Sequence, residues 1–294
     1  MLDDRDLAIF EAARPALRGL AYRILGSLAE AEDAVQDTFL KWQAADRPGI
    51  EVPEAWLTTV CTRRCLDLLK SANRARVDYV GPWLPEPVHT MTDDAPAELA
   101  ASVTTAFLLL LDRLTPKERA AYLLREIFDH DYAEVARILG LQEAACRKLV
   151  SRAQAAVRQA KSRQRVPAAQ QERLLDAFQL AVNSGATGPL SALLADDIAL
   201  RADGGGKVPA ASRVLRGRDE VLGFLTNVLG SAWPNWHQRR QEINGILGMV
   251  LYEGDAIRAS ITFGFDECGA LSDIYIMRNP EKFGGVMGDI RRLH

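Results

Sequence analysis

The spacing of apolar residues changes part-way along this chain, and the change limits the folds that the sequence can adopt. Within residues 1–165, apart from 76–98, apolar side chains recur every three or four positions, as Val35, Phe39 and Trp42 do, which is the spacing of a buried helical stripe. Further helices are expected at 172–183 and 219–229. Strand-like runs then follow at 246–252, 256–265 and 270–277. Helices followed by a meandering sheet predict all-α domains joined to a separate α+β domain.

Local signals show where several helices begin. Ser27 and Glu30 form the S-x-x-E capping box that starts a helix. Thr115, Pro116 and Glu118 predict a second start, because Thr is a good N-cap and Pro suits the first helical position.

Residues 76–98 interrupt the helical pattern. Three prolines between positions 82 and 87 favour extended backbone and leave no helical period. Tyr79, Trp83 and Leu84 lie in the same stretch and are costly to leave in water. We interpret the segment as a linker that needs burial rather than as a free spacer.

The bulk composition is that of an ordinary globular protein, with 294 residues of which 48% are hydrophobic and 26% charged. No apolar run reaches the roughly 18–20 residues that span a bilayer. The N-terminus lacks the apolar stretch of a signal peptide, so a cytoplasmic protein without membrane contact is expected. The four cysteines include no C-x-x-C pair and are expected to be reduced and partly buried.

The net charge of −3 argues against nucleic-acid binding, but the charges are unevenly distributed. Residues 142–165 carry seven basic side chains and one acidic one, and residues 61–76 carry five and one. Residues 30–37 carry four acidic side chains and no basic one. Two basic helices and one acidic helix predict two kinds of partner.

Residues 131–157 have the layout of a helix-turn-helix: a short helix, the turn residue Gly140 and a longer basic helix. The inner faces are expected to consist of Ala136, Ile138, Leu139, Cys146, Leu149, Ala153 and Val157. The outer face is expected to present Arg147, Lys148, Ser151, Arg152, Gln154 and Arg158. Arginine can contact guanine bidentately in the major groove, whereas lysine and the distal arginines would hold phosphates. The alternative is an ordinary amphipathic helix with a solvated basic face, but the turn glycine and the charge excess favour DNA binding.

Three blocks of this sequence resemble a known family. Residues 31–42 resemble sigma region 2.2, the helix that binds the clamp helices of RNA polymerase. Residues 55–67 resemble regions 2.3 and 2.4, which melt and read the −10 promoter element. Residues 114–156 resemble region 4, which reads the −35 element. The spacing of the blocks is similar to that of the extracytoplasmic-function group of sigma-70 factors.

Three further motifs resemble signatures of the members with a C-terminal SnoaL-like extension: WLPEP at 83–87, DGGGK at 203–207 and NPEKF at 279–283. The resemblance implies a multidomain fold with two all-α sigma domains, a region 2 helical bundle and a region 4 helix-turn-helix, followed by an α+β SnoaL/NTF2-like domain. The expected segments are region 2 at 1–75, the linker at 76–98, region 4 at 99–165 and the SnoaL-like domain at 168–294.

The resemblance implies a sigma factor, which directs core RNA polymerase to specific promoters and is not an enzyme. It implies contact with the core polymerase clamp helices through Asp33, Gln36, Asp37, Phe39 and Leu40. It implies contact with −10 promoter DNA through Trp56, Arg63, Arg64, Lys70 and Arg74. It implies contact with −35 DNA through Arg147, Lys148, Ser151, Arg152 and Arg158.

Some of these positions depart from the family or have a second interpretation. Many members have Asn at the position of Arg63, so base capture at the −10 element is expected to differ. Many members have Ser at the position of Gln142. Gln is a weaker N-cap than Ser, so the start of the recognition helix is less sharply defined. Trp56 would stack on a base or, alternatively, pack against the helical core.

We hypothesise that the SnoaL-like domain controls activity in cis through an intramolecular interface. The interface would consist of Trp83, Leu84, Pro85, Glu86, Pro87, Asp203, Gly204, Lys207, Asn279, Pro280 and Lys282. It would fix how regions 2 and 4 are spaced before polymerase binds. A small ligand of this domain stays an open possibility, and no cofactor or metal is expected.

Competing interpretations rest on weaker signals. Asp203 and His237 would form the acid–base pair of an enzyme, but fold alone does not transfer activity. Residues 204–207 lack the full phosphate-loop pattern. Cys61 and Cys65 lie four residues apart, as two metal ligands would, but core packing is favoured. A ligand-sensing one-component DNA-binding regulator is the main alternative, yet a plain repressor has no use for the acidic helix at 31–42.

Overall fold

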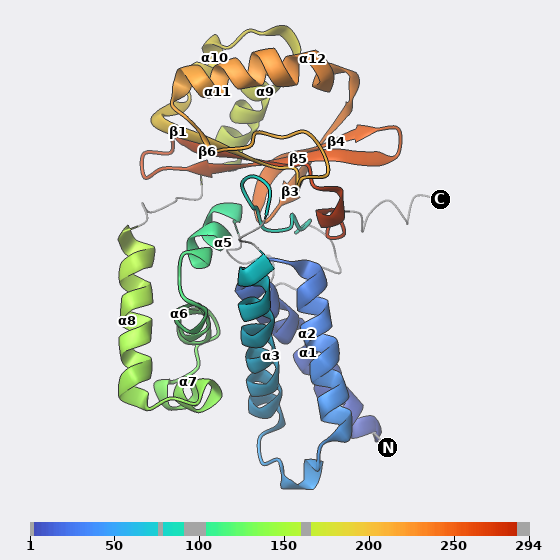
Figure 1. The fold of residues 1–294 in the computed structure, drawn as a ribbon, viewed down its shortest axis with the longest axis vertical. Coiled ribbons are helices and arrows are strands. Elements are labelled where there is room, and N and C mark those ends of the chain that lie inside the picture. Colours follow the sequence, from blue (N-terminus) through green and yellow to red (C-terminus); the bar gives the residue numbers. More distant parts are fainter. Residues whose placement is uncertain (1–2, 76–78, 91–103, 160–165, 287–294) are drawn as a thin grey trace. The chain divides into compact units, whose positions relative to one another are not determined.

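A computed structural model describes residues 3–75, 79–90, 104–159 and 166–286. The chain divides into two compact units (Figure 1). The first, here called the helical unit, combines Met1–Val77, Pro96–Leu99 and Leu110–Ala160. The second, here called the sheet unit, combines Asp78–Ala95, Ala100–Leu109 and Lys161–His294. Each unit is therefore assembled from segments that are distant in the sequence.

The first part of the helical unit contains α1 (Asp4–Leu25), α2 (Leu28–Ala44), the 3-10 helix η1 (Arg47–Gly49) and α3 (Pro53–Ala75). Ser27 caps α2 as predicted, because its hydroxyl accepts a hydrogen bond from the Glu30 N–H at 3.2 Å. The expected apolar stripe of α2 faces the core: Val35 and Trp42 are buried and Phe39 is half-buried.

The second part contains α6 (Pro116–Tyr122), the π-helical turn η3 (Leu123–Ile127), α7 (Tyr132–Leu139) and α8 (Glu143–Gln159). Both α6 and α7 start with a capping box, formed by Thr115 with Glu118 and by Asp131 with Glu134. α7 ends at Gly140, whose φ of 64° is in the left-handed region that glycine adopts without strain. The predicted helix-turn-helix is confirmed.

Helix α5 (Thr105–Asp112) contributes to both units, because the division between them falls after Leu109. Near its start, Ala106 and Leu109 pack in an apolar cluster of the sheet unit. At its end, Asp112 accepts a hydrogen bond from Arg119 of the helical unit at 2.9 Å. The helix is thus a direct covalent link between the two cores.

The sheet unit contains a six-stranded sheet in the order β2-β1-β6-β5-β4-β3. Its strands are β1 (Leu194–Asp203), β2 (Leu215–Arg216), β3 (His237–Ile243), β4 (Ile246–Glu253), β5 (Ala256–Phe265) and β6 (Leu271–Met277). β1 and β6 are parallel and the other neighbours are antiparallel. Because Asp203 lies opposite Met277, the segments that follow β1 and β6 leave the sheet side by side. The topology therefore brings residues 203–207 and 279–283 together.

Helices cover one face of this sheet (Figure 1). They are α9 (Ala168–Ser184), α10 (Gly188–Ser191), α11 (Arg218–Phe224), η4 (Leu225–Leu229), α12 (Gly230–Ala232) and η5 (Trp233–Asn235). The main core lies between them and the sheet and buries large side chains such as Phe178, Trp233 and Phe263.

The opposite face of the sheet carries the linker, the start of α5 and η6 (Pro280–Lys282). Leu84, Ala106 and Phe283 pack there against Tyr275 and other strand residues. Successive residues of a strand point to opposite faces, so β6 places Ile274 in the helix-covered core and Tyr275 beneath the linker. Of the linker residues expected to need burial, Leu84 is buried on this face, whereas Tyr79 and Trp83 are half-buried.

The strand-like runs of the sequence correspond to β4, β5 and β6 within one or two residues. The sequence gives no comparable signal for β1 and β3, because β1 carries three aspartates and β3 is mostly polar. Among the described residues there is no helix that is both long and apolar enough to cross a membrane.

Candidate functional site

Helix α8 presents the basic face that the sequence predicts. Its exposed side chains include Arg147, Lys148, Ser151, Arg152 and Arg158. Its buried side chains are Cys146, Val150 and Ala153, with Leu149 and Val157 half-buried. Val150 is a core residue that the sequence pattern did not identify. The basic residues therefore lie away from the core and are accessible to a large partner.

Arg147 is held in place at the start of this face. Its Nε and Nη2 donate to Glu143 Oε1 at 3.1 and 2.5 Å. Its guanidinium carbon also lies 4.2 Å from the centroid of the Tyr132 ring, which is a cation–π distance. Contact with a base edge would require Arg147 to exchange Glu143 for the base.

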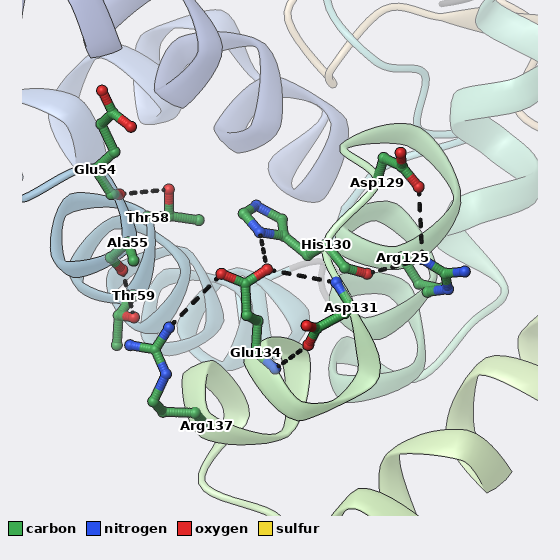
Figure 2. A network of polar contacts seen from close by, with 10 residues as sticks. All are labelled: Glu54, Ala55, Thr58, Thr59, Arg125, Asp129, His130, Asp131, Glu134 and Arg137. Carbon is green, nitrogen blue, oxygen red and sulfur yellow. Dashed lines mark hydrogen bonds and ion pairs between the residues drawn. The ribbon is translucent and has the colours of Figure 1, made fainter. Parts of the chain in front are cut away.

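Figure 2 shows the polar network at the start of α7. Glu134 Oε2 accepts a hydrogen bond from the Asp131 N–H at 3.4 Å and lies 3.3 Å from His130 Nδ1. Its other carboxylate oxygen lies 3.9 Å from an Arg137 nitrogen. Arg125 donates to the His130 carbonyl at 3.1 Å. These contacts fix the first helix of the helix-turn-helix, on which the placement of α8 depends.

Two predicted −10 residues of α3 have partners inside the helical unit. Arg63 donates from Nε to the Ile138 carbonyl at 3.1 Å and from Nη2 to the Arg137 carbonyl at 3.4 Å. These carbonyls belong to the last turn of α7, where the helix dipole attracts a cation. Arg64 donates to Asp37 at 2.6 Å, so the structure joins a predicted −10 residue to a predicted polymerase-binding residue.

The other predicted −10 residues differ in exposure. Trp56 is half-buried, with its ring centroid 5.6 Å from that of Trp42, which supports the core-packing interpretation. Lys70 is exposed and pairs with Asp67 at 2.9 Å, a surface contact of little energetic weight. The side chain of Arg74 lies outside the described residues.

The predicted polymerase-binding residues Asp33, Gln36 and Leu40 are exposed on α2, and Leu40 is 52% exposed. A pocket of about 200 Å³ lies beside them between α1 and α2. It is lined by Phe10, Glu11, Arg14, Glu32, Val35, Gln36 and Phe39. The rings of Phe10 and Phe39, 4.8 Å apart, provide an apolar base within a charged rim. Such a pocket suits an apolar side chain on a partner helix.

In the sheet unit, Asp203 at the end of β1 is fully buried and accepts four hydrogen bonds. Oδ1 accepts from the Tyr79 hydroxyl at 2.6 Å and from the Gly205 N–H at 3.0 Å. Oδ2 accepts from the Leu84 N–H and from Lys282 Nζ, each at 2.8 Å. A buried carboxylate needs such partners to offset its desolvation. Residues from three distant motifs thus meet at one carboxylate.

Lys282 completes this cluster. Its Nζ donates to the Leu84 carbonyl at 2.7 Å and lies 4.9 and 4.5 Å from the ring centroids of Tyr79 and Trp83. Asn279 donates to the Tyr79 hydroxyl at 3.0 Å. Burial and the neighbouring carboxylate raise the pKa of Tyr79 well above its ordinary value, so the hydroxyl remains a donor. We call Tyr79, Trp83, Leu84, Asp203, Asn279 and Lys282 the Asp203 clasp.

The remaining predicted interface residues surround the Asp203 clasp. Pro85, Glu86, Pro87 and Gly204 are buried, whereas Lys207 and Pro280 are exposed. Lys207 pairs with Glu281 at 3.0 Å, with more than half of each side chain exposed. A Cβ on Gly205, whose φ is 59°, would lie 2.3 Å from the Asn279 amide nitrogen, so the loop requires glycine there.

Sequence reasoning missed the polar role of Tyr79 and did not identify Asn244. Tyr79 was recognised only as an apolar residue in the linker. Asn244 and Gly245 form the Asn-Gly turn between β3 and β4, which is a strong hairpin signal. That signal locates the turn but does not show that the Asn244 side chain contacts the linker, 156 residues earlier in the chain.

The structure places the residues of the competing interpretations differently. The oxygens of Asp203 are taken up by the Asp203 clasp, while His237 begins β3 with its ring 6.4 Å from that of Tyr252. Cys61 and Cys65 are fully buried, and their mutual contact together with burial raises the pKa of the Cys65 thiol. The described ranges contain no group of three or more His, Cys, Asp or Glu side chains placed to hold a metal ion.

Comparisons with known proteins extend these observations. Residues 9–75 match the family model for sigma-70 region 2, and residues 104–157 match that for sigma-70, region 4. The chain is 37% identical over 293 residues to the ECF RNA polymerase sigma factor SigJ of Mycobacterium tuberculosis, covering 95% of this chain and 94% of that protein. It is 34% identical over 183 residues to the probable ECF RNA polymerase sigma factor SigI of the same species, covering 60% and 63% of the two chains.

Comparison of the structure with solved structures shows the same similarity to SigJ. The structure matches the crystal structure of Mycobacterium tuberculosis extracytoplasmic function sigma factor SigJ with a TM-score of 0.75 and 32% sequence identity. The match covers 95% of this chain and 98% of that chain, so the similarity includes the sheet unit as well as the helices.

Proposed function

Since this chain belongs to the extracytoplasmic-function sigma factors of the sigma-70 family, we propose which of its surfaces bind core RNA polymerase and promoter DNA and which control that activity. Proteins of this family are transcription initiation factors, not enzymes. The observation that carries the assignment of the DNA contact is the exposed basic face of α8, placed behind a capped helix and a glycine turn.

The α8 face binds −35 DNA in the major groove. Arg147 and Ser151, nearest the turn, contact base edges, because the N-terminal part of a recognition helix enters the groove. Lys148, Arg152 and Arg158 hold phosphates, which fixes the register and contributes most of the salt-dependent affinity. The release of Arg147 from Glu143 is part of binding, and it makes the contact more selective than a free arginine would be.

The exposed face of α2, with the pocket beside it, binds the clamp helices of core polymerase. Asp33 and Gln36 supply polar contacts, and Leu40 supplies exposed apolar area at the centre of the face. Acidic groups on this surface complement a basic partner, which speeds encounter and sets register. The α3 residues bind the opened −10 strand, for which Arg63 must leave the carbonyls of α7.

The sheet unit controls initiation in cis through the Asp203 clasp. The linker follows region 2 directly, and the clasp holds its residues Tyr79, Trp83 and Leu84 on the sheet. Because one end of the linker is fixed in this way, the span available between regions 2 and 4 depends on the clasp. The buried Asp203 serves this contact, which supports a regulatory rather than a catalytic role for the unit.

Promoter-dependent transcription with purified core polymerase tests the DNA contact. The template is selected in vitro from random promoters with the full chain and core. Arg152→Ala should weaken promoter binding across all sequences and reduce the slope of log affinity against log salt by about 1. Lys117→Ala, which removes an exposed charge from α6 of the same unit, is the matched control and should leave both quantities unchanged.

Binding to core polymerase separates this function from a one-component regulator. Leu40→Asp should abolish assembly with core while duplex DNA binding by α8 persists. If the wild-type chain bound duplex DNA but neither assembled with core nor initiated at any selected promoter, a ligand-sensing regulator would replace the assignment made here.

A further inference from the structure

The hairpin turn between β3 and β4 contacts the connection between region 2 and region 4 at two points, Val88 in the linker and Thr105 at the start of α5. The Asn244 side-chain oxygen accepts a hydrogen bond from the Val88 N–H at 2.9 Å, and the Asn244 N–H donates to the Val88 carbonyl at 2.8 Å. The side-chain amide of the same residue donates to Thr105 Oγ1 at 3.2 Å. Val88 lies near the end of the described linker, and Thr105 is the first residue of α5.

Neighbouring contacts reinforce both attachments. On the linker side, Thr90 N–H donates to the Glu242 carbonyl at 3.4 Å, and Thr90 Oγ1 accepts from the Gly245 N–H at 3.0 Å. On the α5 side, Thr105 Oγ1 also lies 3.0 Å from Thr262 Oγ1 on β5. The linker and the start of α5 are therefore bonded to the same corner of the sheet.

The chemistry of this position selects asparagine. Asn244 is 1% exposed and has a φ of 50°, in the left-handed region that asparagine tolerates better than most residues other than glycine. The amide supplies an acceptor for Val88 and a donor for Thr105 at once, whereas aspartate lacks the donor and glycine lacks both groups. A turn that needed only a positive φ would be served equally well by glycine.

We propose that Asn244 is a positioning residue for control in cis: it fixes Val88 of the linker and the start of α5 at one point and so sets the spacing of regions 2 and 4. The inference rests on the proposed control by the sheet unit and adds a second, uncharged anchor to the Asp203 clasp. It gives α5 a defined origin, and α5 continues from that origin into the helical unit.

The primary test uses the full chain with Asn244→Gly, which preserves the left-handed turn and deletes both side-chain bonds. Spin labels at Lys41→Cys on α2 and Ala155→Cys on α8, in a Cys268→Ser background, report the distance between regions 2 and 4. Asn244→Gly should broaden that distance distribution and change initiation with core polymerase by about fivefold or more, the lower end of typical coupling between sites.

Two conservative variants locate the effect. Thr105→Val removes the acceptor of the Asn244 side-chain amide, so it should reproduce part of the effect of Asn244→Gly and should add little in the Asn244→Gly background. Thr226→Val is the matched control, because it removes a hydroxyl of the same unit whose hydrogen bond, to the Leu222 carbonyl, lies away from the linker and α5. If the turn were merely structural, these variants would lower the melting temperature but would not broaden the distribution of distances between the spin labels.

The outcomes separate this inference from the proposed control itself. If Lys282→Met in the Asp203 clasp alters initiation and Asn244→Gly leaves both initiation and label distances unchanged, Asn244 is only a turn residue and the inference fails. If neither variant alters initiation, control in cis fails and this inference fails with it. If Asn244→Gly broadens the distances but initiation is constant, the anchor does not regulate and the inference is again overturned.

Discussion

Two anchors attach the linker to the same face of the sheet, and they do so by opposite chemistry. The Asp203 clasp uses a fully buried carboxylate, an ammonium group and two aromatic rings. The Asn244 anchor uses neutral amide, hydroxyl and backbone groups. Removing the partner of a buried charge is strongly destabilising, because the charge is left unpaired in the core. Removing the partner of a neutral polar group costs only one or two hydrogen bonds. The comparison predicts one strong, all-or-none contact and one weaker, graded contact.

The largest effect is expected from Lys282→Met, which leaves the Asp203 carboxylate buried without its cation. Loss of one partner of a buried pair costs about 3–5 kcal/mol. The free energy of unfolding of the sheet unit, measured by urea denaturation of the full chain, should fall by that amount. A loss under about 1 kcal/mol, as for an ordinary surface pair, would remove the distinction between the two anchors.

Neutralising both charges sharpens the same comparison. Asp203→Asn combined with Lys282→Met should be less destabilising than Lys282→Met alone, because no unpaired charge remains in the core. The double-mutant cycle should show a coupling of about 1–3 kcal/mol, the upper part of the range for residues in contact. Strict additivity of the two substitutions would show that charge pairing does not dominate the clasp.

A smaller effect is expected from Tyr79→Phe, which deletes the donor to Asp203 and keeps the ring over Lys282. The cost should be about 1–2 kcal/mol at neutral pH, the range for a hydrogen bond to a charged group. The pKa of Tyr79 is higher in the folded state than in the unfolded chain. The contribution of the Tyr79 hydroxyl to folding stability is therefore complete below the ordinary pKa of about 10 and is lost as the pH rises above that value. Wild-type stability should therefore fall more steeply than that of Tyr79→Phe above pH 10, in parallel urea titrations.

The smallest effect is expected at Lys207, although it belongs to the same signature as Asp203. Its contact with Glu281 is exposed, and such pairs contribute about 0–1 kcal/mol. Lys207→Ala should leave the urea midpoint almost unchanged and lose its small effect in high salt. A change as large as that of Lys282→Met would mean that position in a motif, rather than burial, sets the energy of these contacts.

The sequence predicted the parts of the structure that have a local signal or a short motif, and it missed contacts between residues that have neither. The capping pairs at Thr115 and Asp131 and the turn at Gly140 have local physical causes, so the helix-turn-helix follows from the sequence. Asp203 and Lys282 were found because they belong to short motifs in a fixed order. Asn244 carries no such motif, and its contact with Val88 depends on a fold that brings together residues 156 positions apart.

The strands show the same limit. β4, β5 and β6 are apolar enough to be recognised, but β1 is obscured by its polar residues, including Arg201, which pairs with Asp273 on the linker-covered side of the sheet. The pairing of Arg63 with the end of α7 was also beyond the sequence, since the acceptors are backbone carbonyls with no side-chain signature. Tertiary contacts to backbone groups leave no trace in composition or spacing.

The long separation between the linker and its partners has a consequence for the newly made chain. Tyr79 and Asp203 are 124 residues apart, and Leu84 and Lys282 are 198 apart. At the usual elongation rate the ribosome takes about 6–40 s to add such lengths. The linker therefore leaves the ribosome long before the strands and the lysine that hold it exist. Regions 2 and 4 are translated before Asp203 and Lys282, so the Asp203 clasp can form only after both regions have been made.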